Sequence, residues 1–405
     1  MKIAIIGAGA SGIFCAANLS NFFDVKIFEA QNAPLKKLLI TGGGRCNFTN
    51  TNIDKLEPKN FYPRGAGNLR KALRQFSSSV SIDFFESRGV STKVEEEGRV
   101  FPKSDKSQDI ANALLKSTNA QIMLNCPIAS VRAIDGKFAV KPVADDEEIF
   151  DAVIFAVGGK WNASLKKSVE EFGHKFEPEI PSLYGLCADN ATDQSWLSGI
   201  TLKDVLLQAD FNGKKIKTSG ALLTTHFGIT GPAVLKFSSF AAKELFASGF
   251  KCSLFVNFLP NENLETISVA FKKARATEAK KLVKNYCPFN LPLAFWSFVL
   301  SNAGVAERTT FANLSKADET KIVKLLSEFE LRVSGKSSSK GEFVSCGGVD
   351  CADVDFNTMQ SKKISNLFFL GECLNIDAIT GGYNLHAAFT TAHVASQHLL
   401  TLSSK

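Results

Sequence analysis

Residues Gly7-Ala8-Gly9-Ala10-Ser11-Gly12 have the types and the spacing of a phosphate-binding turn. The apolar run Lys2–Ile6 precedes them and predicts a buried strand, while the residues that follow have a helical pattern. Gly7 allows a tight turn, Gly9 leaves room for a pyrophosphate against the backbone, and Gly12 lets the helix pack closely on the strand. The free N–H groups and the positive end of that helix would face the phosphates.

An acid stands where such a turn requires one. A second strand, Val25–Phe28, ends directly before Glu29, whose carboxylate can accept hydrogen bonds from the ribose hydroxyls of an adenosine. The same charge repels a 2′-phosphate and disfavours NADP at this site. A merely structural glycine turn is the alternative, but the strand, the helix and the acid together favour dinucleotide binding.

A second glycine-rich stretch, Thr41-Gly42-Gly43-Gly44-Arg45-Cys46-Asn47, follows shortly afterwards. Consecutive glycines can gather several backbone N–H groups into an anion-binding nest, and Arg45 would add a forked cation. A flexible surface turn needs only one glycine. The stretch therefore favours a second set of contacts to the same cofactor.

The C-terminal sequence supplies a third group of motifs. The apolar run Ile364–Leu370 ends on Gly371-Glu372, and Gly381-Gly382 precede a helix expected over Leu385–Leu400. An interior strand, Ile149–Val157, also stops on a glycine pair. Parallel strands that end in this way place their glycines at the ligand-binding edge of a sheet. We therefore expect Glu372 at the opposite end of the cofactor from Glu29.

The middle of the chain has a different character and reads as an insertion. Short alternating runs between residues 183 and 260 predict a β-rich unit, residues 262–330 predict helices, and residues 331–349 return to strand-like sequence. The predicted division is a discontinuous domain over 1–189 and 346–405, an inserted β-rich subdomain over 190–261 and 331–345, and an inserted helical subdomain over 262–330.

Composition indicates an ordinary globular protein of 405 residues, with 45% apolar and 21% charged residues and a net charge of +7. That charge permits anionic partners without requiring them. The nine cysteines include no C-x-x-C pair, and no histidines accompany Cys346 and Cys351, so no metal site is expected. The first strand begins at once, and the apolar run Leu291–Leu300 is too short to cross a bilayer. We expect a cytoplasmic protein without membrane insertion.

Four separated strings in the same order resemble the BaiN/YhiN flavoprotein family, which includes aminoacetone-oxidase-like members. They are Thr41–Asn47, Gly98–Pro102, Thr225–Pro232 and Gly371–Asn384, and the likeness covers essentially the whole chain. The resemblance implies an α/β fold in which both termini build a glutathione-reductase-type, Rossmann-like FAD-binding domain. It also implies an inserted β-barrel-like and helical domain.

The resemblance implies FAD contacts from the N-terminal and C-terminal parts of the chain. The residues concerned are Gly7, Gly9, Ala10, Ser11, Gly12, Glu29, Ala30, Lys37, Thr41, Gly42, Gly43, Gly44, Arg45, Cys46, Asn47, Ile128, Ala156, Val157, Gly158, Gly371, Glu372, Asp377, Gly382, Tyr383, Asn384 and Leu385.

FAD would accept or give a hydride, and the helix that begins near Gly382 would stabilise negative charge on the reduced ring. His226, in a glycine-bounded turn, is a candidate acid or base, although a histidine that caps its own turn is as common. Tyr383 is a second candidate, with packing as its alternative role. Cys46 is expected to contribute its backbone, because no partner for a redox disulfide is near.

No second glycine fingerprint follows Gly159, so NAD(P)H would bind only transiently. We expect NAD(P)H-dependent reduction of an unsaturated or carbonyl-containing small molecule, with an FAD-dependent amine oxidase as the alternative. A flavin-dependent tRNA-modifying enzyme is a lower alternative. Residues Lys272–Lys284 hold six Lys/Arg against one Glu, but no aromatic residue is interleaved with them, so nucleic acid is not the expected partner. A flavin-holding interaction protein is the non-enzymatic alternative.

Overall fold

A computed structural model describes residues 1–189, 197–337 and 344–403. The chain divides into two compact units. Unit 1 comprises Met1–Ile180 and Val344–Lys405, and unit 2 comprises Pro181–Phe343. Unit 1 therefore joins both ends of the sequence, and unit 2 is one continuous insertion.

A seven-stranded sheet forms the centre of unit 1, in the order β19-β20-β21-β10-β1-β2-β6. Its five parallel strands are β1 (Lys2–Ile6), β2 (Asp24–Phe28), β6 (Gln121–Met123), β10 (Ala152–Phe155) and β21 (Leu367–Phe369), and the antiparallel edge is β20 (Gln360–Ser361) and β19 (Val354–Asp355). Ile3, Ala4 and Ile5 are fully buried. Strand β1 is therefore covered on both faces, which explains its unbroken apolar sequence.

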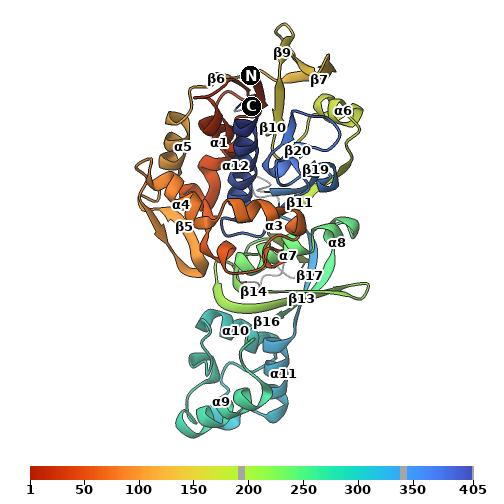
Figure 1. Ribbon diagram of the computed structural model, residues 1–405. Coiled ribbons are helices and arrows are strands. Elements are labelled where there is room, and N and C mark those ends of the chain that lie inside the picture. Colours follow the sequence, from red (N-terminus) through yellow and green to blue (C-terminus); the bar gives the residue numbers. More distant parts are fainter. Residues whose placement is uncertain (190–196, 338–343, 404–405) are drawn as a thin grey trace. The chain divides into compact units, whose positions relative to one another are not determined.

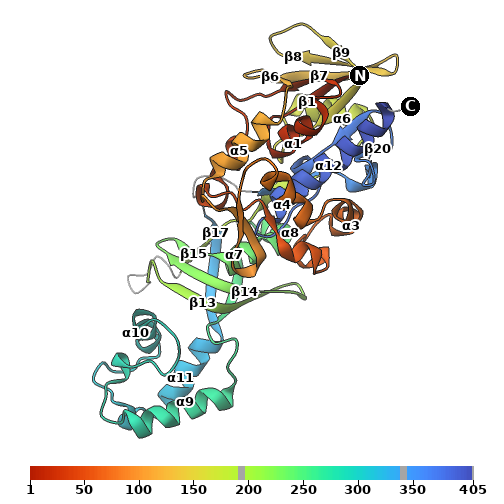
Figure 2. The ribbon, with the colours of Figure 1, turned by 60° about the vertical axis from the view of Figure 1, so that its left-hand side comes forward.

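The first and last long helices of unit 1 pack against each other. Figures 1 and 2 both show α1 (Ala10–Leu19) beside α12 (Tyr383–Ser403). The rings of Phe14 and Phe389 lie 5.0 Å apart. The remaining helices of this unit are α2 (Lys36–Ile40), α3 (Ala66–Gln75), α4 (Ser78–Glu86), α5 (Ser107–Lys116) and α6 (Ala163–Glu171).

Three small sheets complete unit 1. They are β3 (Thr49–Asn50) with β5 (Arg99–Pro102) and β4 (Thr92–Val94), β7 (Ile128–Ile134) with β8 (Lys137–Pro142) and β9 (Glu148–Phe150), and β11 (Phe176–Ser182) with β18 (Val344–Val349). The strand expected over Ile149–Val157 is thus two strands, β9 and β10. Asp151 separates them because its backbone N–H and its carboxylate both bond the backbone of Lys2, each at 2.8 Å.

Unit 2 contains a closed barrel in the strand order β12-β15-β14-β13-β16-β17. The strands are β12 (Leu186–Ala188), β13 (Thr201–Phe211), β14 (Lys214–Thr225), β15 (Gly228–Thr230), β16 (Cys252–Asn257) and β17 (Phe329–Lys336), accompanied by α7 (Pro232–Phe240) and α8 (Ala242–Ala247). These two helices meet at Ala241, which ends α7 and precedes α8.

Three helices are inserted between β16 and β17: α9 (Leu264–Thr277), α10 (Leu293–Asn302) and α11 (Lys316–Ser327). They share one apolar core with the barrel, and within it Trp296 is fully buried and donates its ring N–H to the Val283 carbonyl at 2.7 Å. The expected fold class, a Rossmann-like domain with an inserted barrel and helices, is confirmed. In the part of the chain that the structure describes, every helix is too short or too polar to cross a membrane.

Candidate cofactor site

The first glycine turn has the geometry that its sequence predicts. Gly7 has a φ of 110°, and a Cβ there would lie 2.4 Å from the Ala156 carbonyl oxygen. A Cβ on Gly12 would lie 2.0 Å from the Gly7 oxygen, whereas a Cβ on Gly9 would meet no atom within 4 Å. Gly7 and Gly12 are thus needed for packing, and Gly9 faces open space in which a ligand can approach the backbone.

Glu29 is held rigidly at the end of β2. Its two carboxylate oxygens accept hydrogen bonds from the backbone N–H groups of Ala8, at 2.7 Å, and Gln31, at 2.8 Å. Each oxygen keeps a further lone pair that can accept a hydrogen bond from a hydroxyl group. Ala30 follows directly, and Ile128 is buried at the start of β7.

Four residues of the stretch Thr41–Asn47 have a left-handed backbone. They are Gly42, Gly43 and Gly44, with φ of 59°, 69° and 85°, and Cys46, with φ of 60°. Glycine adopts this backbone without steric strain. Added Cβ atoms on Gly43 and Gly44 would meet nothing within 4 Å. Burial raises the pKa of the Cys46 thiol to about 12. The thiol is therefore protonated at neutral pH, which fits a backbone role for this residue.

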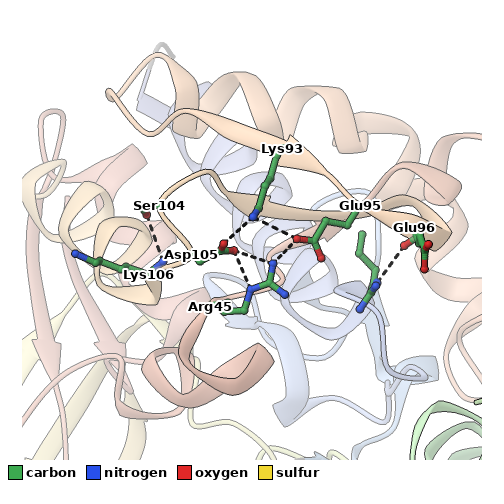
Figure 3. Close-up of polar contacts among 8 residues, drawn as sticks. Arg45, Lys93, Glu95, Glu96, Ser104, Asp105 and Lys106 are labelled. Carbon is green, nitrogen blue, oxygen red and sulfur yellow. Dashed lines mark hydrogen bonds and ion pairs between the residues drawn. The ribbon is translucent and has the colours of Figure 1, made fainter. Parts of the chain in front are cut away.

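Arg45 does not present a free cation to the loop, in contrast to our expectation. Figure 3 shows its guanidinium between Glu95 and Asp105, and Lys93 bridges the same two carboxylates. The guanidinium also lies 4.1 Å from the centre of the Phe101 ring. These cations hold the pKa of Glu95 and of Asp105 below the ordinary value. The two cations balance the two carboxylates, and Arg45 ties the glycine loop to β4 and β5. A contact between the Arg45 backbone and FAD stays a prediction.

Glu372 gathers three segments at the C-terminal end of the sheet. One of its oxygens accepts from the Lys37 ammonium at 2.7 Å, and the other accepts from the Ser345 backbone N–H at 2.9 Å. A Cβ on Gly159 would lie 3.0 Å from Glu372 Oε1. The structure therefore brings together Lys37, Glu372 and the end of β10. Ala156, Val157 and Gly158 form that end.

The start of α12 lies against the N-terminal segments. A Cβ on Gly371 would lie 3.2 Å from the Ser11 hydroxyl, and a Cβ on Gly382 would lie 2.5 Å from the Thr49 carbonyl and 2.7 Å from Asn47 Oδ1. Asn47 Oδ1 is buried and, among the described residues, has no hydrogen-bond partner. The two ends of the chain thus meet at one place within unit 1.

Side chains that sequence reasoning missed hold this junction. His386 accepts from the Thr49 hydroxyl at 2.8 Å and donates to the Phe76 carbonyl at 3.1 Å. Burial lowers the pKa of His386 to about 4, so its ring is neutral at pH 7. Asn50 donates its amide to the Gly381 carbonyl at 2.9 Å. The available signal was a histidine in the first turn of the helix that follows the glycine pair.

The loop before α12 is fixed by two further contacts. Arg64 forms a two-pronged ion pair with Asp377, whose side chain is fully buried. Asn384, in the first turn of α12, bonds both the N–H and the carbonyl of Ala378, at 2.9 and 3.0 Å. Asp377 and Asn384 therefore have structural partners of their own, and their contacts with FAD stay predictions. Leu385 follows Asn384 in this turn.

The two acid–base candidates lie in different units. Tyr383 is 6% exposed and stacks on Phe61 with 4.5 Å between ring centres, and burial raises the pKa of its phenol. That geometry matches the packing role. His226 is exposed in the turn between β14 and β15 of unit 2, and its ring lies 5.1 Å from that of Phe227. Acid–base roles for both residues stay predictions.

The residues of unit 1 fit a dinucleotide by their chemistry. Gly9, Gly43 and Gly44 leave backbone open to a ligand. The first turn of α1 has no side-chain cap, so its N–H groups are free to bind an anion. The unpartnered oxygen of Asn47 can accept a hydrogen bond from a bound group.

Comparisons with known proteins identify the family and the fold of the chain. Residues 1–398 match the HI0933-like protein Rossmann domain. A ribosomal RNA dihydrouridine synthase of Haemophilus influenzae is 28% identical over 97% of this chain and 96% of its own. A 3-dehydro-bile acid delta(4,6)-reductase of Clostridium scindens is 25% identical over 98% of both chains. Among solved structures, 3-ketosteroid delta1-dehydrogenase of Sterolibacterium denitrificans shares the fold with a TM-score of 0.50 and 12% identity, covering 100% of this chain and 99% of that one.

The fold and the site define an FAD-dependent oxidoreductase of the Rossmann type. The chain belongs to the HI0933-like family, which confirms the resemblance to BaiN/YhiN flavoproteins. FAD is the cofactor expected of its members.

Proposed function

We propose that this protein reduces a carbon–carbon double bond conjugated to a carbonyl group, with NAD(P)H as the electron donor. The favoured substrate is the uracil ring of ribosomal RNA. This raises RNA modification above the small-molecule substrates and the amine oxidation that the sequence alone favoured.

The observation that carries the proposal is a reaction common to two relatives with unlike substrates. Dihydrouridine is uridine whose C5–C6 double bond, conjugated to a carbonyl, has been reduced. The bile acid relative is named for reducing double bonds that are conjugated to a 3-keto group. Both relatives align over almost the whole chain. The dihydrouridine synthases include a second example, from Escherichia coli, at 27% identity over 99% of this chain, and this supports RNA over a steroid.

The reaction adds a hydride to the β-carbon of the substrate and a proton to its α-carbon, and NAD(P)H supplies the two electrons. When bound, FAD supplies hydride chemistry at its N5 atom. The residues of this chain would bind and orient the cofactor. Glu29 would accept hydrogen bonds from the ribose hydroxyls, and the glycine turns would leave room for the pyrophosphate. The first turn of α12 presents backbone N–H groups that stabilise negative charge. His226 is the candidate donor of the proton, which in its absence would come from water.

Mass spectrometry of the product tests the proposal. Transcripts of the small-subunit and large-subunit ribosomal RNAs are made in vitro and are therefore free of dihydrouridine. They are incubated with the FAD-loaded protein and NADPH or NADH. We expect uridine to gain two hydrogens at a defined position. A conjugated keto-steroid and aminoacetone serve as competing substrates. Oxidation of aminoacetone without any reduction of RNA or steroid would overturn the proposal in favour of the amine oxidase.

Position 9 offers a matched pair of control variants. Because a Cβ on Gly9 meets nothing within 4 Å, both Gly9→Ala and Gly9→Glu can fold. The side chain of Gly9→Ala is a single methyl group in the space left for the pyrophosphate, whereas the longer, charged side chain of Gly9→Glu would fill that space and repel the phosphates. We expect Gly9→Ala to bind FAD more weakly and keep part of its RNA reduction, and Gly9→Glu to lose FAD and activity together. Equal activity in the two variants would contradict the assigned position of the phosphates.

A further inference from the structure

Unit 2 carries almost all of the net positive charge of the protein. Residues 181–343 hold 20 Lys/Arg and 14 Asp/Glu, whereas the rest of the chain holds 27 and 26. Unit 2 thus has a formal surplus of six positive charges, and unit 1 has a surplus of one. A surplus confined to one part of a protein indicates attraction to a polyanion rather than a general effect on solubility.

Backbone pairing gathers several of these cations into a basic corner, defined here as Lys280, Lys281, Lys284, Tyr286 and Arg308. The Val283 N–H donates to the Thr309 carbonyl at 2.9 Å, and the Phe311 N–H donates to the Lys281 carbonyl at 3.2 Å. The segment after α9 therefore lies alongside residues 308–311, and Arg308 is brought to the lysines. Two acids lie here: Glu278 pairs with Lys281, and Glu307 pairs with Lys284.

Helix α9 extends this charge along one face. Its residues Ile267, Phe271 and Ala274 are buried in the core of unit 2, and this directs Lys272 and Lys273 to solvent. Figure 2 shows α9 along the edge of the helical part of unit 2. Within the described residues, no ion pair involves Lys272, Lys273 or Lys280. The Arg45 cluster of unit 1 is different, because carboxylates there match the cations in number.

An aromatic ring lies among these cations. Lys281 Nζ is 5.0 Å from the centre of the Tyr286 ring, and the Tyr286 and Phe311 rings pack edge to face at 77°, with 5.8 Å between their centres. Tyr286 is half-buried, so part of its side chain is exposed to solvent. Residues 272–284 include no aromatic residue, and the fold supplies one from just beyond that range. An aromatic face beside lysines is the arrangement with which proteins hold unpaired bases.

We propose that the basic corner and the adjoining lysines of α9 bind unpaired or loop RNA, with the lysines on phosphates and Tyr286 stacked on a base. This inference rests on the proposed function and assigns its RNA-binding surface. A simpler role for cations after a helix, stabilisation of its C-terminal dipole, accounts for charge only within the last turn. It does not account for six cations spread from Lys272 to Arg308, or for the ring among them.

Salt dependence of RNA binding tests the lysines in the full-length, FAD-loaded protein. The variant Lys272→Gln/Lys273→Gln/Lys280→Gln removes three exposed cations, and Lys55→Gln/Lys59→Gln/Lys116→Gln makes the same charge change on exposed lysines of unit 1. Each phosphate contact contributes about 0.7 to 0.9 to the slope of log K against log salt. We expect the unit 2 variant to lose about two units of slope and at least about tenfold in affinity for ribosomal RNA transcripts. The unit 1 variant should stay within about twofold of the parent.

Position 286 tests the stacking separately. Tyr286→Phe keeps the aromatic face and Tyr286→Leu removes it, while both keep an apolar contact with Phe311. We expect Tyr286→Leu to weaken RNA binding about fivefold or more without changing the salt slope, and Tyr286→Phe to bind like the parent. Equal binding by the two variants would overturn the role assigned to the ring.

The outcomes separate this inference from the proposed function. If the parent reduces RNA and both triple variants bind it equally well, the surface is wrong and the function stands. If the parent neither binds nor reduces ribosomal RNA, both fail. If the unit 2 triple variant loses binding to phosphatidylserine vesicles while its RNA binding is unchanged, the corner is a membrane-binding surface and the inference is overturned. The rate of flavin reduction by NADPH, measured without RNA, should be the same in every variant.

Discussion

Glu29 shows how one side chain can serve both the fold and the cofactor. Its carboxylate bonds the backbone of the glycine turn at Ala8 and of the next loop at Gln31. These bonds fix the position of both oxygens before a ribose arrives, so binding requires little reorganisation. Arg45 shows the opposite case, since a residue that the sequence marks as a ligand is used to hold its own loop.

Replacing Glu29 should therefore weaken FAD binding strongly. In Glu29→Ala the turn loses two charge-assisted hydrogen bonds and the ribose loses its acceptor. Such bonds contribute about 1.5 to 3 kcal/mol each, so the FAD dissociation constant should rise about 10- to 100-fold or more. Titration of the apoprotein with FAD, followed by flavin fluorescence, measures this. Glu29→Gln is the shape-matched control and should be affected less, and an unchanged affinity in Glu29→Ala would show that the nucleotide does not lie at this turn.

Helix α12 is the element on which the site depends most. Its start is joined to β3 through Thr49 and His386, and to the glycine loop through the close approach of Gly382 to Asn47. These contacts link residues more than 300 positions apart, for example Thr49 and His386 at a separation of 337. The last helix of the chain thereby becomes part of a site whose other residues lie near the N-terminus of the chain.

The buried histidine of this helix should make stability depend on pH. The pKa of His386 is about 4 in the folded protein and about 6.5 in an unfolded chain. The unfolded chain therefore binds the proton more readily, and stability is complete above pH ~6.5 and falls as the pH is lowered towards 4. His386→Gln cannot titrate. Urea unfolding should show the advantage of the parent over this variant falling by about 3 kcal/mol between pH 7 and pH 4, and a constant difference would contradict the neutral buried ring.

The position of the helix start should tune the flavin potential. An alanine at Gly382 would bring its Cβ to 2.5 Å from the Thr49 carbonyl at a φ of 95°, so the first turn must move. A helix N-terminus contributes about 0.3 to 2 kcal/mol of stabilisation to a nearby anion, which for two electrons corresponds to a decrease of about 6 to 40 mV in the flavin potential of Gly382→Ala. Spectroelectrochemistry of the bound flavin measures it. Gly67→Ala, at an open helical position with no contact within 4 Å, is the control, and equal potentials would count against the role of α12.

At the scale of the whole molecule, the chain leaves unit 1 after strand β11 and returns to it at strand β18. Strands β11 and β18 form a two-stranded sheet, so the points where the chain departs and returns are adjacent. The hydrophobic core of unit 2 consists of residues from its own barrel and helices. Each unit therefore has the means to fold around its own core.

Removing unit 2 should separate cofactor binding from catalysis on RNA. A chain in which a short Gly/Ser linker replaces residues 183–343 should still bind FAD, because the glycine turns, Glu29 and Glu372 all belong to unit 1. It should lose RNA binding and reduction. Absorption spectra and gel-shift titrations measure the two properties. A colourless but folded product, judged by circular dichroism, would contradict a cofactor site contained in unit 1.

Local demands on the backbone made much of the site predictable from the sequence. Gly7, Gly12 and Gly382 are each required by a close approach that no side chain allows, and Glu29 stands at a fixed distance from its turn. Long-range pairs were not predictable in this way. The separation of Arg64 from Asp377 is 313 residues, and nothing in the spacing of the sequence links them. Helical spacing also continues through residues 68–88, yet α3 ends before Phe76, and Ser77 caps the separate helix α4 by accepting from the Val80 N–H at 3.2 Å.

The two half-reactions, followed by flavin absorbance under anaerobic conditions, test the central claim most directly. We predict that NADPH or NADH bleaches the flavin of the purified protein and that ribosomal RNA transcripts restore its colour at the rate at which dihydrouridine forms. A flavin that aminoacetone bleaches while both nicotinamides leave it oxidised, or one whose colour only oxygen restores, would contradict it.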